Sequence, residues 1–410
     1  MRKKVCIGDL GTVVTGKTPS KSNKAFYGDY ALFLKPTDIS ECCKFTYKTE
    51  EMFSQLAADK FASSLIPEGA ICIPCIGTIG TKMTMSHCEC YTNQSINSIV
   101  CNDKYDNEYV YYLMKNFLPN LKSYNLGTAS GREFISKSNF EKIEIIAEQD
   151  KNIQNKIGNF LSRYDSLIEN YQKQIKLLEE SAQRLYKEWF VDLRFPGHEN
   201  TKIVDGVPEG WKMISIDSLV GKLESGSRPK GGIDTSIKDG VASVGAENVI
   251  GLGQYNFSSK KLVSYDFYNN AKKGRIENKD ILIYKDGAYI GRTSLFQDNF
   301  PHKEAMINEH VFLLHTKKEV NQYFLFFTLY QKVYFEKMQK LNKNAAQPGL
   351  NQNAIKSLKL LMPNEKLIVR FDEIISPMMK VLFDLANQIP HLTEARDRLL
   401  PKLMSGEIEV

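Results

Sequence analysis

The chain has 410 residues, of which 42% are hydrophobic and 25% charged. This composition is typical of folded globular proteins and excludes fibrous and disordered ones, and the length predicts two to four domains. A net charge of +6 permits a polyanionic partner without requiring one. The longest apolar run, Tyr323–Tyr330, is far shorter than the roughly 20 residues of a membrane span. Because the N-terminus lacks the apolar stretch of a signal peptide, we expect a cytoplasmic protein.

Residues 1–148 are expected to form the first of two α+β globules. Glu68-Gly69 is a turn before a predicted strand, Ile71–Ile73, and Gly-containing loops follow it. The first quarter of the chain contains all eight cysteines. Since a secreted fold would spread its disulfides over the whole chain, we interpret these cysteines as reduced thiols.

Residues 149–195 are predicted to form a long amphipathic helix. Apolar side chains recur at steps of three and four from Ile153 to Trp189, a spacing that places them on one helix face. At 1.5 Å per residue such a helix is ~55 Å long, which suits a spacer. Phe195-Pro196-Gly197 is expected to end this region.

Residues 196–363 are expected to form a second α+β globule, with a strand at Ile281–Tyr284. Residues 199–363 contain 23 basic and 17 acidic residues, so nearly all the positive excess lies here. Several lysines and arginines are interleaved with aromatic residues such as Tyr289, a mixture suited to phosphate, sugar and base contacts. The alternative is a solvated charged face.

Residues 364–410 repeat the amphipathic pattern from Leu367 to Leu403, with only Arg396 out of character. Three prolines, at 377, 390 and 401, predict kinks or breaks in this helix. Because both helices present an apolar face, we expect them to pack against each other rather than to be unrelated surface helices. The residues predicted to make this packing are Ile157, Phe160, Tyr164, Leu178, Leu185, Phe371, Ile374, Met378, Leu392 and Leu399.

The two halves of the chain match each other at an offset of about 210 residues. Gly16 and Pro19 correspond to Gly226 and Pro229, and the two helices match at an offset of 214, with Leu367 against Ile153. Duplication is the economical explanation. The predicted fold is therefore α+β, with two tandem domains separated by two long helices and related by a pseudo-twofold axis.

Three motifs indicate other chemistry but fit it poorly. Residues 11–18 match the phosphate-binding loop pattern, yet Pro19 follows and the repeat lacks the lysine. Cys72, Cys75, Cys88 and Cys90 have zinc-like spacing, but Cys72 aligns with Leu282 of an apolar strand. Residues 277–279 have the E-x-K form of a nuclease site but align with a turn. We therefore expect no catalytic residues, no metal and no cofactor.

Five short segments resemble one known family. They are Gly16–Pro19, Glu148-Gln149, Tyr186–Asp192, Val207–Trp211 and Ala345–Asn351. With the duplicated arrangement, they make the chain similar over essentially its whole length to the specificity subunits of type I restriction-modification systems. In two places the halves differ: Ile7–Leu10 has no equivalent of Pro208–Trp211 before it, and Ser130–Arg132 stands in the place of Gln347–Gly349.

The resemblance implies a specific organisation. Residues 1–148 and 196–363 would be target-recognition domains that each read half of a split site in double-stranded DNA. Residues 149–195 and 364–410 would be conserved helical spacers that pair antiparallel. These helices would dock two methyltransferase subunits that modify adenine N6, and the complex would recruit motor-nuclease subunits that use ATP. The chain itself would have no catalytic activity.

Because the two globules differ in sequence, we expect a non-palindromic target of two short half-sites with an unspecified spacer. The candidate DNA contacts are Lys17, Lys35, Arg132, Arg228, Lys230, Lys285, Arg292 and Lys343. Candidate partner surfaces are the exposed faces of residues 150–192 and 365–404, where Arg184 and Arg398 occupy equivalent positions.

Other protein classes stay open at this point. A nucleotide-binding protein would depend on Lys17 and Thr18, and a self-contained nuclease would need metal-dependent cleavage by the isolated chain. A coiled-coil scaffold without a DNA function would show no salt-dependent duplex binding.

Overall fold

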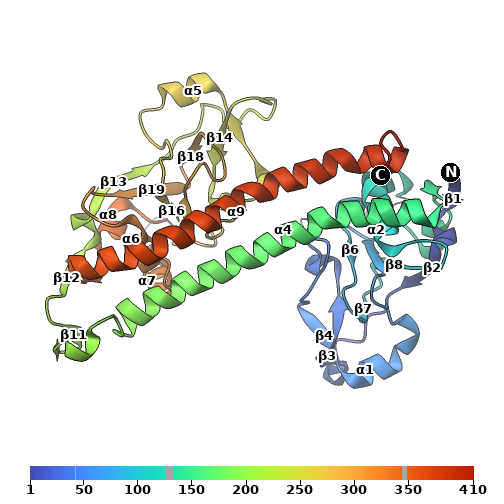
Figure 1. Cartoon of the computed structure of the whole chain (residues 1–410), viewed down its shortest axis with the longest axis horizontal. Coiled ribbons are helices and arrows are strands. Elements are labelled where there is room, and N and C mark those ends of the chain that lie inside the picture. The colour runs from blue at the N-terminus through green and yellow to red at the C-terminus, as the bar shows by residue number, and fades with distance from the viewer. Residues whose placement is uncertain (42, 126, 128–132, 344–348) are drawn as a thin grey trace. The chain divides into compact units, whose positions relative to one another are not determined.

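The computed structural model describes residues 1–41, 43–125, 127, 133–343 and 349–410, with the backbone alone at Asn342 and Lys343. The chain divides into two compact units (Figure 1). Unit 1 comprises Met1–Glu169 and His391–Val410, and unit 2 comprises Asn170–Pro390. Within the described residues, no helix is both long and apolar enough to cross a membrane.

Among its described residues, unit 1 contains three small sheets and three short α-helices, besides parts of two long helices. A four-stranded sheet has the order β2-β8-β5-β6, a three-stranded sheet has the order β4-β3-β7, and β1 pairs with β9. The strands are β1 (Arg2–Cys6), β2 (Gly11–Thr15), β3 (Tyr27–Leu34), β4 (Glu51–Phe53), β5 (Ile71–Pro74), β6 (Thr84–Met85), β7 (Cys90–Thr92), β8 (Ile96–Cys101) and β9 (Glu144–Glu148), and the helices are α1 (Gln55–Lys60), α2 (Asn107–Phe117) and α3 (Lys137–Glu141).

Unit 2 repeats this plan. The corresponding sheets have the orders β13-β19-β16-β17 and β15-β14-β18, and β12 pairs with β20. The strands are β12 (Lys212–Ser215), β13 (Val220–Ser225), β14 (Val241–Val244), β15 (Leu262–Val263), β16 (Asp280–Tyr284), β17 (Thr293–Phe296), β18 (Ala305–Ile307), β19 (Val311–Thr316) and β20 (Lys359–Met362), with a further hairpin of β10 (Ile203–Val204) and β11 (Val207–Pro208); the helices are α5 (Tyr265–Asn270), α6 (Gln322–Leu329), α7 (Lys332–Lys343) and α8 (Gln352–Ser357).

The two units share strand order, strand direction and register. In each three-stranded sheet one pair is parallel, β3 with β7 and β14 with β18. In each four-stranded sheet the register also matches, since Ile71 faces Ile99 as Ile281 faces Leu314. The predicted duplication and the α+β fold class are therefore confirmed, and so are the predicted strands at Ile71–Ile73 and Ile281–Tyr284.

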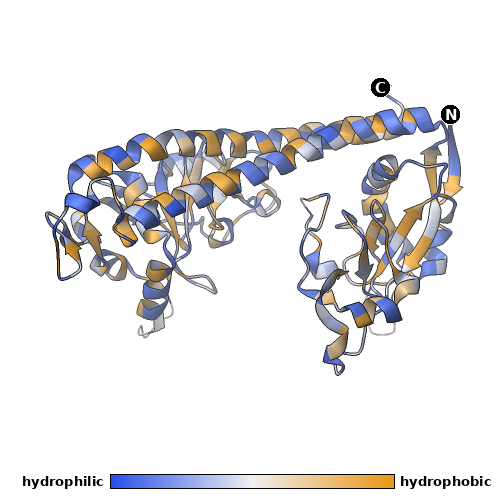
Figure 2. Cartoon of the chain, turned by 60° about the horizontal axis from the view of Figure 1, so that its bottom comes forward, coloured by the Kyte–Doolittle hydropathy of each residue, from blue (hydrophilic) through white to orange (hydrophobic). Residues whose placement is uncertain are grey.

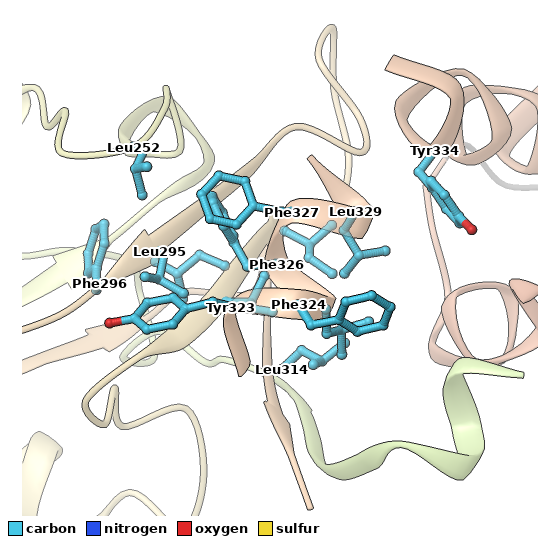
Figure 3. Close-up of a cluster of buried hydrophobic side chains, with 14 of the residues drawn as sticks. Leu252, Leu295, Phe296, Leu314, Tyr323, Phe324, Phe326, Phe327, Leu329 and Tyr334 are labelled. Atoms are coloured by element: carbon cyan, nitrogen blue, oxygen red, sulfur yellow. The ribbon is translucent and has the colours of Figure 1, made fainter. Parts of the chain in front are cut away.

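The core of unit 2 is built around α6. Every residue of this helix is buried, because a helix that is apolar on all sides can only be stable inside a core. Figure 3 shows its aromatic rings among Leu252, Leu295 and Leu314 of the surrounding segments. Its one phenol, on Tyr323, donates a hydrogen bond of 2.6 Å to Gln297 Oε1, so the buried hydroxyl has a partner.

Two long helices, α4 (Lys151–Tyr186) and α9 (Glu365–Ser405), contribute residues to both units. A π-helical turn, Lys187–Val191, follows α4. Hydrophilic and hydrophobic residues alternate along both helices (Figure 2). Within unit 2, Trp189 lies against Phe371, and the Tyr171 hydroxyl donates to Gln388 Oε1 at 3.1 Å. The helices are thus antiparallel there, because partner numbers fall along α9 as they rise along α4.

The same direction holds within unit 1, where α9 contributes its last turns. Lys156 Nζ lies 3.3 Å from the Val410 carbonyl oxygen, and Asp165 pairs with Arg396. Ile157 and Leu161 share one hydrophobic cluster with Leu400, Leu403 and Met404. The predicted packing between the two helices therefore occurs in each unit.

The buried positions of α4 and α9 match residue for residue at the offset of 214. Among the described residues of the two helices and of the turn after α4, nine pairs are buried in both copies: 154 and 368, 157 and 371, 161 and 375, 165 and 379, 168 and 382, 182 and 396, 186 and 400, 189 and 403, and 190 and 404. Among the residues predicted to pack, Ile157 and Phe371 are buried, whereas Phe160, Leu178, Leu185, Met378 and Leu399 are partly buried against the cores. Tyr164 and Leu392 are half-buried.

Two expectations for the helices are wrong. Ile374 is 40% exposed, and the next residue, Ile375, fills the core position instead. The prolines do not divide α9, which is helical from Glu365 to Ser405. Pro377 and Pro401 lie on exposed positions, and we attribute the continuity to the buried residues on either side, whose packing offsets each lost backbone hydrogen bond.

Candidate nucleic-acid interface

The loop Gly16–Pro19 in unit 1 and its counterpart Gly226–Pro229 in unit 2 are built in the same way. Each loop leaves its strand and crosses close to a neighbouring strand. A Cβ on Gly16 would lie 2.0 Å from the Thr92 oxygen, and one on Gly226 would lie 1.9 Å from the Ile307 oxygen. Only glycine permits so close an approach, so the motif glycines fix the path of both loops.

This geometry does not suit a nucleotide phosphate. The Lys17 amide already donates to the Thr92 oxygen at 3.0 Å, and the next helical segment after it is the single 3₁₀ turn Lys24–Phe26. A phosphate-binding loop needs free amides at the N-terminus of a helix. The close similarity of residues 11–18 to such a loop therefore reflects the glycines' structural role.

Equivalent residues meet at the tip of both loops. In unit 1 the Thr18 hydroxyl donates to Gln94 Oε1. In unit 2 Arg228 Nε lies 2.8 Å from Glu309 Oε1. Thr18 and Arg228 occupy the same place in the repeat, and Gln94 and Glu309 each follow the asparagine that precedes the last strand of its four-stranded sheet, β8 or β19. A neutral pair in one unit thus becomes a charged pair in the other.

Two other predicted contacts of unit 2, Lys285 and Lys230, lie beside this position or near it in sequence, and a third, Arg292, lies on another loop. Lys285 Nζ donates to the Glu309 carbonyl oxygen at 3.0 Å. Lys230 is exposed, in the loop that contains Arg228. The Arg292 guanidinium carbon lies 3.9 Å from the centre of the Tyr289 ring, and that ring is 51% exposed. A stacked guanidinium beside an exposed aromatic ring can contact both phosphate and base.

A rigid frame presents Tyr289 and Arg292. Between them, Ile290 is buried in the core, and its carbonyl accepts a hydrogen bond from Gln339 Nε2 of α7. Gly291 has a φ of +87°, and a Cβ there would lie 2.8 Å from Met338. Packing thus holds the loop from behind, so the exposed side chains need little ordering on binding.

The predicted contacts of unit 1 differ in their surroundings. Lys17 is exposed, and its Nζ lies 3.5 Å from Ser63 Oγ. Lys35 is only 18% exposed, and its ammonium lies 3.0 Å from both Glu50 and Glu51. Although burial lowers the pKa of Lys35, these two carboxylates outweigh that effect and raise it. Lys35 therefore stays protonated, and its positive charge is already paired with two carboxylates within the fold. Its DNA contact stays a prediction.

Two further predictions cannot be placed. Arg132 lies outside the described residues, as does most of Ala345–Asn351. Lys343 ends α7, but its side chain is not among those described. Gln94 and Glu309 are the residues that sequence reasoning missed. Aligning Asn93–Ser95 with Asn308–His310 across the repeat could have found them.

Several motif residues that carry the family resemblance are structural. Glu148 is 2% exposed, and its carboxylate accepts hydrogen bonds from the Gln149 and Asp150 amides at the start of α4. Trp189, Phe190 and Trp211 pack in the core of unit 2, where the Phe190 and Trp211 ring centres are 6.1 Å apart. These segments join the globules to the helices rather than form a reactive site.

The remaining motifs also have structural explanations. Cys72 and Cys75 are buried in unit 1, and burial raises the pKa of Cys75 to about 12. Within the described residues, no group of three or more His, Cys, Asp or Glu could hold a metal ion. Residues 277–279 form the predicted turn, with a φ of +68° at Lys279 and an ion pair of 2.9 Å between Glu277 and Lys222.

Comparison with known proteins gives the family. A family model described as the type I restriction modification DNA specificity domain matches residues 2–180 and 208–394. The chain belongs to the family of type I restriction-modification specificity subunits. The two matched segments correspond to the two copies of the repeat, so the predicted resemblance is confirmed.

Individual relatives agree with this assignment. The MjaIX specificity subunit of Methanocaldococcus jannaschii is 26% identical over 98% of this chain and 93% of its own length. The HindI specificity subunit of Haemophilus influenzae is 38% identical over 34% of this chain and 30% of its own. The crystal structure of a type I S subunit from M. genitalium has the same fold, with a TM-score of 0.62 at 16% identity, covering 98% of this chain and 96% of the other.

Proposed function

We propose that this specificity subunit reads a bipartite, non-palindromic target in double-stranded DNA, one half-site with each copy of the repeat. The observation that carries the proposal is the equivalent loop tip, where one scaffold presents Thr18 and Gln94 in unit 1 but Arg228 and Glu309 in unit 2. Two copies with the same frame and different polar groups are suited to reading two different sequences.

The proposed target-recognition domains are residues 1–148 and 196–363, and the helical spacers are residues 149–195 and 364–410. The basic excess in residues 199–363 supports a larger phosphate contribution from the second domain. The proposed DNA contacts remain Lys17, Lys35, Arg132, Arg228, Lys230, Lys285, Arg292 and Lys343.

The helices are the proposed docking surface for partner subunits. Leu177 of α4 is 61% exposed, and Val369 and Val381 of α9 are 51% and 47% exposed. Apolar side chains at exposed helix positions are suited to burial against another protein. Arg184 is also exposed, whereas Arg398 is exposed but paired with Glu394. The partners we propose are two adenine-N6 methyltransferase subunits and the motor-nuclease subunits, which would supply all catalysis.

The experiment is to express the chain with its modification subunits in a host that lacks them and to map N6-methyladenine across the genome. We expect methylation at one two-block sequence with a fixed gap, and its loss when this chain is omitted. Methylation that is unchanged without the chain would contradict the proposal. Methylation that does not depend on the chain is also the result expected if the chain were a scaffold without a DNA function.

A further inference from the structure

The Thr18–Gln94 pair and the Arg228–Glu309 pair stand on similar frames. In unit 1 the Asn93 amide donates to the Leu34 oxygen at 3.0 Å, and in unit 2 the Asn308 amide donates to the Val244 oxygen at 3.0 Å. The glycines at 16 and 226 allow no Cβ. The backbone that presents the four side chains therefore has two equivalent contacts in both units, one from the asparagine amide and one at the loop glycine.

Stability does not explain why the side chains differ. Thr18 and Gln94 are exposed, and the Arg228 side chain is 60% exposed. An ion pair at such a surface contributes little to folding. Buried positions of the repeat mostly remain apolar, whereas this position changes from neutral to charged. The backbone is similar in the two units, and the exposed side chains on it differ in charge. This difference indicates that the two surfaces contact different groups of a ligand.

The hydrogen bonds within each pair leave the outer groups available. Arg228 uses Nε toward Glu309, and no partner for its two terminal amino groups is recorded among the described residues. Such a fork matches the O6 and N7 acceptors of guanine in the major groove. In unit 1 Gln94 Oε1 accepts from Thr18 and keeps a second acceptor site beside the two donors of Nε2. This donor and acceptor match the N7 and N6 groups of adenine, respectively.

We propose that the two pairs are equivalent base readers, one for each half-site. Arg228 reads a guanine and Gln94 reads an adenine, and Glu309 and Thr18 are positioning residues that orient them. This inference rests on the proposed bipartite function and adds to it the residue and the base at one position of each half-site. Lys17, Lys230 and Lys285 flank the readers as phosphate contacts.

The test uses the complex of the full chain with its modification subunits and the target found by methylation mapping. Competition binding would compare the target with every duplex that carries one substituted base pair. The variants are Arg228→Ala, Arg228→Lys, Glu309→Gln and the double variant Thr18→Ala with Gln94→Ala. Matched controls are Lys104→Ala and Lys318→Ala, which lie at equivalent exposed positions beyond the far ends of β8 and β19.

For Arg228→Ala we expect the discrimination at one G·C pair of one half-site, about 5- to 150-fold in the unmodified complex, to fall nearly to one. The other half-site should be unaffected. Arg228→Lys should reduce the same discrimination, because one ammonium replaces the planar two-donor fork, while keeping the salt dependence of binding, because the charge remains. Glu309→Gln should weaken selection at that same base pair only. The Thr18 and Gln94 double variant should act on one A·T pair of the other half-site.

A uniform loss of affinity for all duplexes would overturn the inference, since it would identify phosphate contacts. Unchanged discrimination in Arg228→Lys would overturn it as well, and this variant also covers a failure of Arg228→Ala to fold. The proposed function is tested separately. If methylation mapping gives no two-block target, bipartite reading itself is wrong. If it gives a two-block target but the variants do not change discrimination, only the assignment of the base-reading pairs is wrong.

Discussion

Arg396 of α9 and Asp165 of α4 form a buried ion pair within unit 1. Both side chains are 7% exposed, and the Tyr112 hydroxyl donates a further hydrogen bond to the Asp165 carboxylate. The equivalent positions in unit 2 hold Ala182 and Met379, which are fully buried. Here the duplicated helix packing is polar in one copy and apolar in the other. Arg396, the residue that broke the repeat pattern, is thereby explained.

The chain itself contains the apolar replacement for this ion pair. Arg396→Ala should destabilise the protein by about 3–5 kcal/mol, because it leaves the Asp165 charge buried without its main partner. The double variant Arg396→Ala with Asp165→Met copies unit 2 and should recover most of that loss or exceed the original stability. Urea unfolding followed by fluorescence measures both. A double variant no more stable than the single one would show that unit 1 depends on the charges.

The stability of unit 2 should depend on pH through Asp280. Burial raises the pKa of Asp280 to about 6, against the hydrogen bonds from the Glu277 amide and His315. An unfolded aspartate has a pKa of about 3.9. Between these values the folded state binds more protons, so stability should fall as pH rises from about 4 to about 6, by at most about 2–3 kcal/mol.

Unit 1 provides the control for this dependence, because the equivalent positions hold Ala70 and Val100. Asp280→Ala with His315→Val should flatten the stability profile between pH 4 and 6. Asp266→Asn, at an exposed carboxylate, should leave it unchanged. Thermal unfolding across this pH range would show the difference, and an unaltered slope in the double variant would assign the dependence to another group.

The loop glycines should tolerate no side chain. Gly16→Ala and Gly226→Ala would each place a Cβ about 2 Å from a backbone oxygen, so we expect losses of roughly 1–3 kcal/mol as the loop moves away from its strand. Gly77→Ala is the matched control, since nothing lies within 4 Å of its added Cβ and only its φ of +81° opposes the change. If all three variants unfold at the same urea concentration, close strand contact is not what requires glycine at 16 and 226.

The exposed valines of α9 should matter for assembly and not for folding. Val369→Asp and Val381→Asp should leave the unfolding transition of the isolated chain nearly unchanged while reducing co-purification of the modification subunits. Val333→Asp, at a 50% exposed valine of α7, is the control and should retain the partners. Equal loss of partners in all three variants would remove the α9 surface as the docking site.

Much of the fold could be predicted because the duplication provides an internal comparison. The matching strands and the paired helices follow from apolar patterns that survive in both halves. The packed face of the helices was harder to locate. The predicted face ran through Tyr164, next to the buried Asp165, and in the repeat through Met378, next to the buried Met379. A buried charge becomes recognisable only when its partner is known.

The candidate interface could be predicted only in part. Lys17 and Arg228 stand out as basic residues of a repeated loop, and Lys285 and Arg292 follow a predicted strand. Gln94 and Glu309, which contact Thr18 and Arg228, lie far away from these loops in sequence and reach them only in the folded chain. Lys35 is the opposite case. The sequence shows a basic residue, but only the folded chain shows that the Glu50 and Glu51 carboxylates lie beside it.

Selection of bound duplexes from a random library by the purified complex tests bipartite reading most directly. We predict enrichment of two short, different blocks separated by a fixed number of unspecified base pairs, with the Arg228→Ala complex relaxed in one block only. Enrichment of a single contiguous motif, or of none with the complex intact, would contradict the assignment of one half-site to each copy of the repeat.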